Sequence, residues 1–288
     1  MTTFIKYHGL GNDFIILTPD GGEDAPSLTP ERARELCRRG FGVGADGAMT
    51  ADPPPPGVDA HLTMRLVNSD GSIPEMCGNG IRCFVKYAVD ELGRTDNPLR
   101  VATPGGVKAC RWFSGPDGRV ARVEVDMGAP SFERRRVPMQ GDGDALDVEV
   151  STEERAFTAT GVNTGNPHMV IFGSSERDLA RTFGPTLTAH PLWPEGANVE
   201  FTQVIAADHL RVAVWERGCG LTEACGTGAT AAAAAAVRHG LARPETPITV
   251  SLPGGDLVIT VAADFSTARM TGPATEVYRG VLSGERDA

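Results

Sequence analysis

The sequence has few lysines, no long apolar run and no excess of positive charge. The three lysines, Lys6, Lys86 and Lys108, do not stand in a context typical of a Schiff base, which disfavours a pyridoxal cofactor. No apolar run approaches the roughly 18 residues of a membrane span, and no N-terminal segment has the pattern of a signal peptide. A net charge of −10 argues against nucleic acid and anionic membranes as partners. We therefore expect a cytoplasmic protein.

The cysteines lack the spacings of a metal site or a disulfide framework. There are six of them, without a Cys-x-x-Cys motif. Five residues separate Cys77 from Cys83 and Cys219 from Cys225, which is not a common zinc spacing. In a cytosolic chain of this size such cysteines are more typical of free thiols. We expect neither a metal nor any other cofactor.

One short motif occurs twice, about half a chain length apart. Residues 76–80 read Met-Cys-Gly-Asn-Gly, and residues 224–228 read Ala-Cys-Gly-Thr-Gly. The correspondence extends backwards to His61-Leu62 and His209-Leu210, and Asn12 and Asn166 follow glycines at comparable places. A repeat of this length predicts two similar lobes rather than a solenoid. A chain of 288 residues is long enough for two such domains.

A helix is predicted directly after each repeated motif. Apolar residues recur at helical spacing from Ile81 to Leu92, and Gly93 is expected to close that helix. The second helix should run from about Gly226 to His239, and its middle is apolar on every side, which indicates complete burial. Short strands surround both helices. The fold class expected is α+β: two pseudo-symmetric lobes, each a mixed, mainly antiparallel sheet wrapped around a central helix.

Several further elements follow from local patterns. Thr29-Pro30 has the signature of a helix start, with threonine as the cap and proline at the first helical position. The apolar segments predict strands at residues 3–7, 14–17, 61–67, 100–102, 107–113 and 120–127 in the first half and near 158–160, 169–172, 200–205 and 210–215 in the second.

The two repeated cysteines have the environment of reactive thiols. Cys77 and Cys225 each precede a helix, where unpaired backbone N–H groups and the helix dipole favour an anion. The glycines beside Asn79 and Thr227 allow a ligand to approach the backbone closely. Those donors could stabilise the negative charge that develops on a bound carboxylate. Two thiols, one in each lobe, could remove a proton from one face of a carbon and return one to the other.

With these motifs the chain resembles the diaminopimelate epimerases, which do not use pyridoxal. The resemblance covers nearly the whole sequence in order, and the two cysteine motifs together are highly specific. The segments that carry it are residues 8–14 (HGLGNDF), 42–47 (GVGADG), 68–72 (NSDGS), 76–83 (MCGNGIRC), 165–168 (GNPH), 216–218 (ERG) and 222–228 (TEACGTG).

The resemblance implies a role for each matching residue. Cys77 and Cys225 would be the acid–base pair, and His168 and Glu216 would help to set which thiol is ionised. The reacting carboxylate would be held by Gly78, Asn79, Gly226 and Thr227. The distal end of the substrate would be held by Asn12, Asn68, Asn166, Asn198 and Arg217, with Glu216 able to accept from an ammonium group.

The resemblance also implies the organisation and the activity. Residues 1–128 with 272–288 would form the N-terminal lobe and residues 129–271 the C-terminal lobe, with the active site in the cleft between them. The expected enzyme is an isomerase that converts LL-2,6-diaminopimelate into the meso form, a step in lysine biosynthesis and in the supply of peptidoglycan precursor. A homodimer is expected on the same ground.

Two other classes of function stay open on the sequence alone. Another two-cysteine racemase or epimerase of the same scaffold could act on proline, hydroxyproline or histidine. Proline racemase-like sequences usually show histidine where Asn79 stands and lack the Glu216-Arg217 pair. A non-catalytic thiol protein, either a redox sensor or a ligand-binding module, would need no second cysteine for any chemistry.

Overall fold

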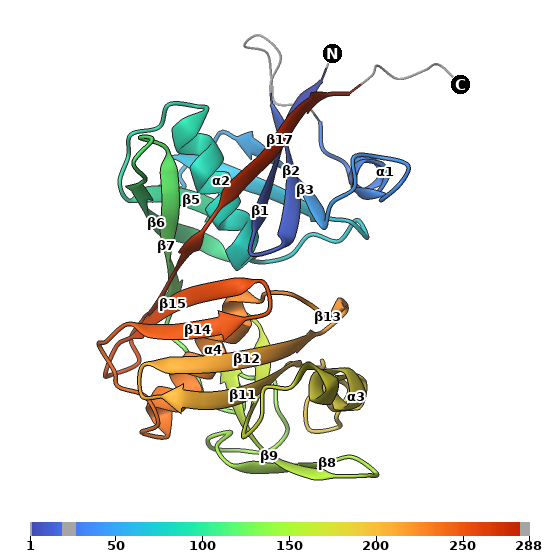
Figure 1. Ribbon diagram of the computed structural model, residues 1–288, viewed down its shortest axis with the longest axis vertical. Helices are drawn as coiled ribbons and strands as arrows, with labels where there is room; N and C mark the ends of the chain where they lie inside the picture. The colour runs from blue at the N-terminus through green and yellow to red at the C-terminus, as the bar shows by residue number, and fades with distance from the viewer. Residues whose placement is uncertain (1, 19–26, 283–288) are drawn as a thin grey trace. The chain divides into compact units, whose positions relative to one another are not determined.

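The computed structural model describes residues 2–18 and 27–282, and the chain divides into two compact units (Figure 1). Unit 1 comprises Met1–Val125 together with Gly272–Ala288, and unit 2 comprises Asp126–Thr271. Strand β7 (Val120–Gly128) carries the chain from unit 1 into unit 2, and the last strand, β17 (Thr275–Val281), belongs to unit 1 again. Unit 1 is therefore built from two separate stretches of sequence, whereas unit 2 is continuous.

Unit 1 begins with an antiparallel pair of strands and continues through two helices. In chain order it contains β1 (Thr3–Gly9), β2 (Asn12–Thr18), α1 (Pro30–Cys37), β3 (Gly47–Asp52), β4 (Leu62–Asn68), α2 (Gly78–Asp90), β5 (Leu99–Thr103) and β6 (Gly106–Ser114) before β7. The β2–β3 and β4–β5 pairs are parallel, and the other pairs in this unit, including β1–β17, are antiparallel. Parallel pairs occur where a helix connects the two strands.

Unit 2 repeats this plan. In chain order it contains β8 (Val148–Ser151), β9 (Ala156–Asn163), β10 (Pro167–Phe172), α3 (Arg177–Thr188), β11 (Asn198–Ala206), β12 (His209–Glu216), β13 (Gly220–Leu221), α4 (Gly226–Arg238), β14 (Ile248–Leu252), β15 (Gly255–Val261) and β16 (Ala268–Pro273). The β10–β11 and β12–β14 pairs are parallel, at the places that correspond to β2–β3 and β4–β5. The prediction of two similar lobes with mixed, mainly antiparallel sheets is confirmed.

Each unit is organised around one buried helix. Helix α2 contacts β1, β2, β3, β4 and β6, and helix α4 contacts β9, β10, β11, β12, β14 and β15. Every residue of α4 from Gly226 to Ala236 is buried, and so is every residue of α2 from Gly78 to Ala88. The six consecutive alanines of α4 keep its cross-section small, so strands can pack against every side of it.

The helix boundaries correct one expectation. Helix α2 ends at Asp90 rather than at Leu92, and the Leu92 side chain is exposed. Leu92 N donates instead to Tyr87 O, and Gly93 adopts a positive φ of 66°, so the chain turns away before the last apolar position reaches the core. Helix α3 is an element that the sequence analysis did not assign. The cap predicted for α1 is confirmed, because Thr29 Oγ1 accepts from Arg32 N.

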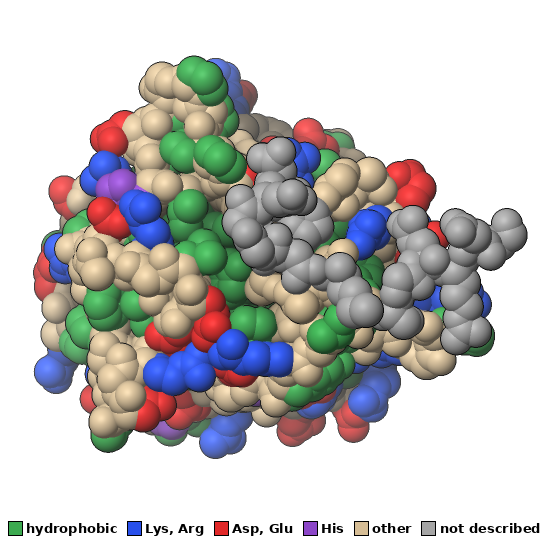
Figure 2. Space-filling view, turned by 90° about the horizontal axis from the view of Figure 1, so that it is seen from above, with side chains coloured by type: hydrophobic (Ala, Val, Ile, Leu, Met, Phe, Trp, Pro, Cys, Tyr) green, Lys and Arg blue, Asp and Glu red, His purple; other side chains and the backbone are tan. Residues whose placement is uncertain are grey.

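The surface does not show a continuous field of one charge on the face drawn in Figure 2. Lys and Arg side chains lie there beside Asp and Glu side chains, with hydrophobic side chains between them. Within residues 2–18 and 27–282, no helix combines the length and the hydrophobicity needed to cross a bilayer.

Candidate active site

Cys77 caps the buried helix of unit 1 with its own sulfur. Its backbone is extended, and Gly80 N donates to Cys77 Sγ over 3.3 Å. Cysteine thus occupies the place where serine or aspartate usually accepts from the first turn of a helix. The sulfur is held at the positive end of the α2 dipole, which favours its thiolate form.

A polar network surrounds Cys77. Asn12 Oδ1 lies 4.0 Å from Cys77 Sγ and accepts from Asn79 Nδ2 over 3.3 Å. Asn12 Nδ2 donates in turn to Asp46 Oδ2 over 2.7 Å, so the amide cannot rotate freely. The structure therefore brings together three predicted site residues of unit 1, the thiol and two amides.

Arg82 supports this network through hydrogen bonds from its side chain. Its guanidinium is completely buried and donates to Gly78 O over 2.8 Å, to Asn79 Oδ1 over 2.9 Å and to Pro273 O over 3.1 Å. Burial lowers the pKa of Arg82 to about 10, which leaves it cationic at neutral pH. Arg82 belongs to the 76–83 segment that carries the resemblance, but no role was predicted for it.

Asn68 approaches the same region from the end of β4. Its side-chain amide donates to Ser72 Oγ over 3.0 Å, and the next residue, Ser69, donates its backbone N–H to Asp46 O over 2.8 Å. Asp46 is the residue that holds Asn12. The 42–47 and 68–72 segments of the sequence thus meet through hydrogen bonds around Asp46.

Cys225 caps the buried helix of unit 2 in the same way. Gly228 N donates to Cys225 Sγ over 3.3 Å, the distance found at Cys77. The surroundings differ, because the Cys225 thiol lies within hydrogen-bonding reach of the Glu216 carboxylate and beside Thr227 Oγ1 at 3.4 Å. Desolvation raises the pKa of Cys225 well above its ordinary value, and the charges of Glu216 and Glu200 raise it further.

His168 lies in the interior of unit 2 with a partner on each ring nitrogen. Its Nδ1 is 2.7 Å from Glu200 Oε1, and its Nε2 is 2.7 Å from Asn166 Oδ1. Both His168 and Glu200 are completely buried. Asn166 and His168 were predicted site residues, whereas Glu200 was not.

Glu216, Arg217 and Asn198 lie close together at the end of β12. Asn198 Oδ1 accepts from Arg217 N over 2.9 Å, and the Arg217 guanidinium donates to Glu195 O over 2.6 Å. Thr222 Oγ1 donates to Glu216 Oε1 over 2.6 Å. Desolvation raises the pKa of Glu216, and the hydrogen bonds from Thr222 and Cys225 oppose that rise. The exposed Arg217 side chain is the one arginine or lysine among the predicted site residues.

The raised pKa of Cys225 gives a first testable prediction. A raised pKa keeps the thiol protonated at neutral pH, so alkylation of Cys225 by iodoacetamide should rise only at a pH above that of an ordinary thiol. The rates at each pH can be followed by mass spectrometry of the Cys225 peptide. The exposed Cys219 serves as an internal reference in the same digest. If the alkylation rates of Cys225 and Cys219 rise at the same pH, the pKa of Cys225 is not raised. Only the pH of the rise bears on the pKa, because burial of Cys225 by itself slows the reagent at every pH.

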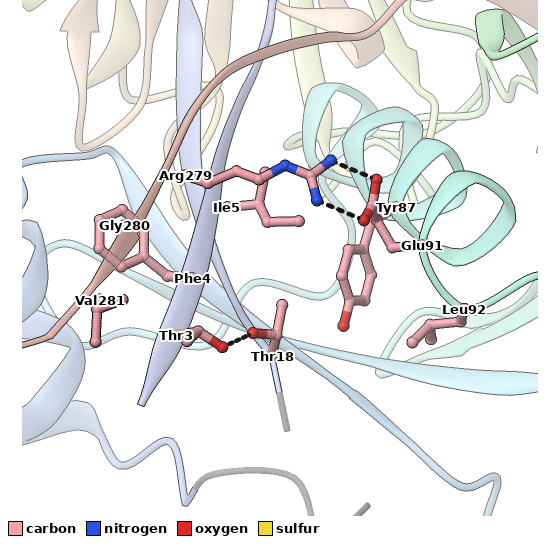
Figure 3. A pocket seen from close by; sticks show the side chains of 10 residues that line it. All are labelled: Thr3, Phe4, Ile5, Thr18, Tyr87, Glu91, Leu92, Arg279, Gly280 and Val281. Atoms are coloured by element: carbon pink, nitrogen blue, oxygen red, sulfur yellow. Dashed lines mark hydrogen bonds and ion pairs between the residues drawn. The ribbon is translucent and has the colours of Figure 1, made fainter. Parts of the chain in front are cut away.

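The arrangement of donors does not resemble a metal site. Among residues 2–18 and 27–282, no group of three or more His, Cys, Asp or Glu side chains is placed to hold a metal ion. A separate cavity of about 470 Å³ lies in unit 1, where Glu91 and Arg279 form an ion pair beside Tyr87 (Figure 3). None of the predicted site residues lines it.

Comparison with solved structures defines the class of fold. The chain superimposes on a probable proline racemase from Agrobacterium radiobacter with a TM-score of 0.68 and 17% identity, covering 99% of this chain and 94% of that one. A hydroxyproline epimerase from Agrobacterium vitis gives a TM-score of 0.66 at 16% identity, covering 97% and 91%. The fold is therefore that of the proline racemase-like epimerases.

Comparison of sequences identifies the family within that fold. A diaminopimelate epimerase from Moorella thermoacetica is 45% identical over 279 residues, covering 96% of this chain and 98% of the relative. A diaminopimelate epimerase from Desulfitobacterium hafniense is 44% identical over 283 residues, covering 96% and 97%. The family model for diaminopimelate epimerase matches residues 4–133 and 160–277. The chain belongs to the diaminopimelate epimerase family.

Proposed function

We propose that this protein is an isomerase that inverts one α-carbon of LL-2,6-diaminopimelate to give the meso form, using Cys77 and Cys225 as two bases. The observation that carries the proposal is that both thiols cap the N-terminus of a buried helix and accept from a glycine N–H at 3.3 Å. Family membership supports the substrate, and lysine biosynthesis follows from that activity.

The chemistry needs only the protein's own groups. A thiolate Sγ takes the α-proton, and the electron pair of the broken C–H bond moves into the substrate carboxylate to give an enolate. The other thiol then delivers its proton to the opposite face of the same carbon, forming a new C–H bond and leaving a thiolate. No atom is gained or lost, and the two sulfurs exchange protonation states. The two-base mechanism therefore requires that the α-carbon meet both thiols.

The charges around the two cysteines support a proposal for their resting states. Arg82, a buried cation, lies in the first turns of the helix that Cys77 caps, whereas the carboxylates of Glu216 and Glu200 surround Cys225. A cation favours a nearby thiolate, and a carboxylate favours a nearby thiol. We infer that Cys77 is the resting thiolate and Cys225 the resting thiol.

The remaining predicted residues would bind the two ends of the substrate. The reacting carboxylate and its developing charge would be bound at the first turns of α2 and α4, at Gly78, Asn79, Gly226 and Thr227, where the positive ends of both helix dipoles lie. The distal carboxylate and ammonium would be held by Arg217 and Glu216, with the asparagines Asn12, Asn68, Asn166 and Asn198 around them. A cytoplasmic homodimer without nucleic-acid or membrane partners completes the proposal, supported by the family and by the net charge of −10.

The test is incubation of the purified protein with LL-diaminopimelate in heavy water. We expect meso-diaminopimelate with solvent deuterium at the inverted α-carbon, because the returned proton comes from a thiol that exchanges with solvent. Chiral chromatography and mass spectrometry measure both quantities. The same rate is expected after dialysis against a chelator and without added pyridoxal phosphate.

The matched control uses proline, hydroxyproline and histidine under the same conditions. Turnover of one of these in place of diaminopimelate would identify a different epimerase of the same fold. Absence of deuterium incorporation into any of the four amino acids would instead indicate a thiol protein without this chemistry.

A further inference from the structure

Strand β11 buries a stripe of polar side chains beneath helix α4. Asn198, Glu200 and Thr202 are 3%, 0% and 0% exposed, and they alternate with the apolar Val199 and Phe201. Because alternate residues of a strand share a face, these three polar groups lie in one row. Helix α4 packs against β11. The Glu200 carboxylate consequently lies in the interior of unit 2, next to the first turn of the helix that Cys225 caps.

Glu200 contacts both His168 and the first turn of α4, the helix that Cys225 caps. Its Oε1 pairs with His168 Nδ1 at 2.7 Å. The same oxygen lies so close to Gly228 that a β-carbon there would be 2.7 Å away, and Gly228 N is the donor to Cys225 Sγ. Glu200 Oε2 is buried and lacks a hydrogen-bond partner within the described part of the chain. A carboxylate that stays ionised in such a place is stabilised by a positive charge beside it.

His168 is the group that can supply this charge. A neutral imidazole has one N–H, so it can donate from only one ring nitrogen. Here Nδ1 faces a carboxylate oxygen and Nε2 faces the amide oxygen of Asn166, and both of these are acceptors. Only a ring that carries both protons can donate to both acceptors, and that form would be an ion pair with Glu200.

The charged and polar groups around Cys225 come from three elements. Glu216 lies on β12 and Glu200 on β11, while Thr227 Oγ1 and Gly228 N belong to α4 itself. His168, on β10, acts electrostatically on Glu216. Glu200 thus contacts His168 directly and acts electrostatically on Cys225.

We propose that Glu200 is a positioning residue for the epimerisation: it holds the His168 ring doubly protonated toward Asn166, and its negative charge keeps Cys225 as the proton donor. This inference rests on the proposed function. Glu200 acts through His168 and Cys225 and does not touch the substrate. Its role resembles that of a carboxylate that orients an active-site histidine and stabilises its imidazolium form.

The variant that tests the proposal is Glu200→Gln, which keeps the size and a hydrogen-bond acceptor but removes the charge. We expect kcat for diaminopimelate to fall by about 10- to 100-fold, as for other carboxylates that orient a functional histidine. The alkylation midpoint of Cys225 should move down by about one pH unit, because a neighbouring negative charge is lost. A merely structural role would leave this midpoint unchanged.

The matched control is Thr202→Val, which removes a buried polar group from the same row on β11. Thr202 Oγ1 donates to the backbone oxygen of Glu200 at 3.5 Å and does not reach the carboxylate. We expect this variant to keep the wild-type alkylation midpoint and pH–rate profile. If the alkylation midpoint of Cys225 shifts as much in Thr202→Val as in Glu200→Gln, the proposal is wrong. The shift would then come from disturbed packing of β11 and not from the charge of Glu200.

Two further measurements keep the proposal testable if Glu200→Gln does not fold. Nitrogen-15 NMR of the histidine side chains in the wild-type protein, with the His168 signal assigned by His168→Gln, should show a doubly protonated ring at pH 7. The variant Glu200→Asp retains the charge and should retain the high alkylation midpoint of Cys225. A neutral His168 in the wild type, or a lowered midpoint in Glu200→Asp, would overturn the assignment.

These readouts separate this inference from the proposed function. The NMR and alkylation measurements need no substrate, so they decide the role of Glu200 even if diaminopimelate is not turned over. If the wild-type protein epimerises diaminopimelate and Glu200→Gln does so at the same rate with the same profile, the inference about Glu200 fails alone.

Discussion

Replacing either Cys77 or Cys225 with serine is expected to reduce epimerisation of diaminopimelate by more than about 10²-fold, the typical contribution of a positioned acid or base. Serine at either position can still accept the helix-capping hydrogen bond, so each variant should fold. Serine can donate a proton weakly, but it is a very poor base at neutral pH. The rates of LL-to-meso and meso-to-LL conversion measure the loss.

A diaminopimelate analogue with a leaving group on the β-carbon separates the two half-reactions. Its carbanion expels the leaving group, so only one base is needed. Each variant should then eliminate from one stereoisomer only, and Cys77→Ser and Cys225→Ser should have opposite preferences. The exposed Cys219 gives a control, since Cys219→Ser should retain wild-type activity. If both site variants prefer the same stereoisomer, the two-base assignment is wrong.

The second large effect is expected from Gly228→Ala in helix α4. A methyl group there would lie 2.7 Å from Glu200 Oε1 and 3.3 Å from Cys225 Sγ. The carboxylate cannot retreat without breaking its contact with His168, and the sulfur cannot retreat without losing its hydrogen bond from Gly228 N. Displacement of catalytic groups by about 1 Å can cost about 10²-fold in rate, which is the loss of kcat that we expect.

Gly80→Ala is the matched control, because Gly80 occupies the equivalent position in helix α2. Its added methyl would meet Cys77 Sγ and Met49 Cε, both at 3.3 Å, and the flexible methionine can move. The preference of about 1 kcal/mol for alanine over glycine inside a helix is common to both variants, so the difference between them reports the crowding. We expect Gly80→Ala to keep considerably more activity. Equal losses in the two variants would show that Glu200 is not what makes position 228 sensitive.

The repeat, the two central helices and the paired cysteines could all be predicted from the sequence, for physical reasons. Helix α4 is apolar on every side, a pattern that only a helix buried on all faces can satisfy, and α2 has the spacing of a buried face. In each Cys-Gly-x-Gly motif the cysteine occupies the N-cap position of the helix that follows. Local chemistry of this kind is visible in a short segment of sequence.

Helix α3 was not predicted because its local signals are weak. Pro185 lies inside it, and its cap residue, Glu176, makes no side-chain capping bond. The repeat itself contained the missing information, since α3 connects β10 to β11 as α1 connects β2 to β3. Tertiary packing against β11 and β12 compensates for the poor local sequence.

Glu200 was missed as a site residue because its sequence context is ambiguous. Polar residues that alternate with Val199 and Phe201 are typical of a strand with one face in water. In the structure both faces of β11 are buried, from Asn198 to Thr202. The helix that covers the polar face begins more than twenty positions later in the chain, so no local pattern could reveal the burial.

Because unit 1 is built from two separate stretches of sequence, its last strand is synthesised only after the whole of unit 2. The continuous stretch Asp126–Thr271 is synthesised before Gly272–Ala288, which completes unit 1. Strand β1 obtains its partner β17 only when synthesis is finished, and Arg82 obtains its hydrogen bond to Pro273 O at nearly the same moment. The hydrogen bond from Arg82 to Pro273 O, which fixes the side chain that holds Asn79 beside Cys77, therefore forms last. A chain that stops short of Gly272 would keep the capping hydrogen bond at Cys225 but lack both β17 and the Pro273 oxygen that Arg82 binds.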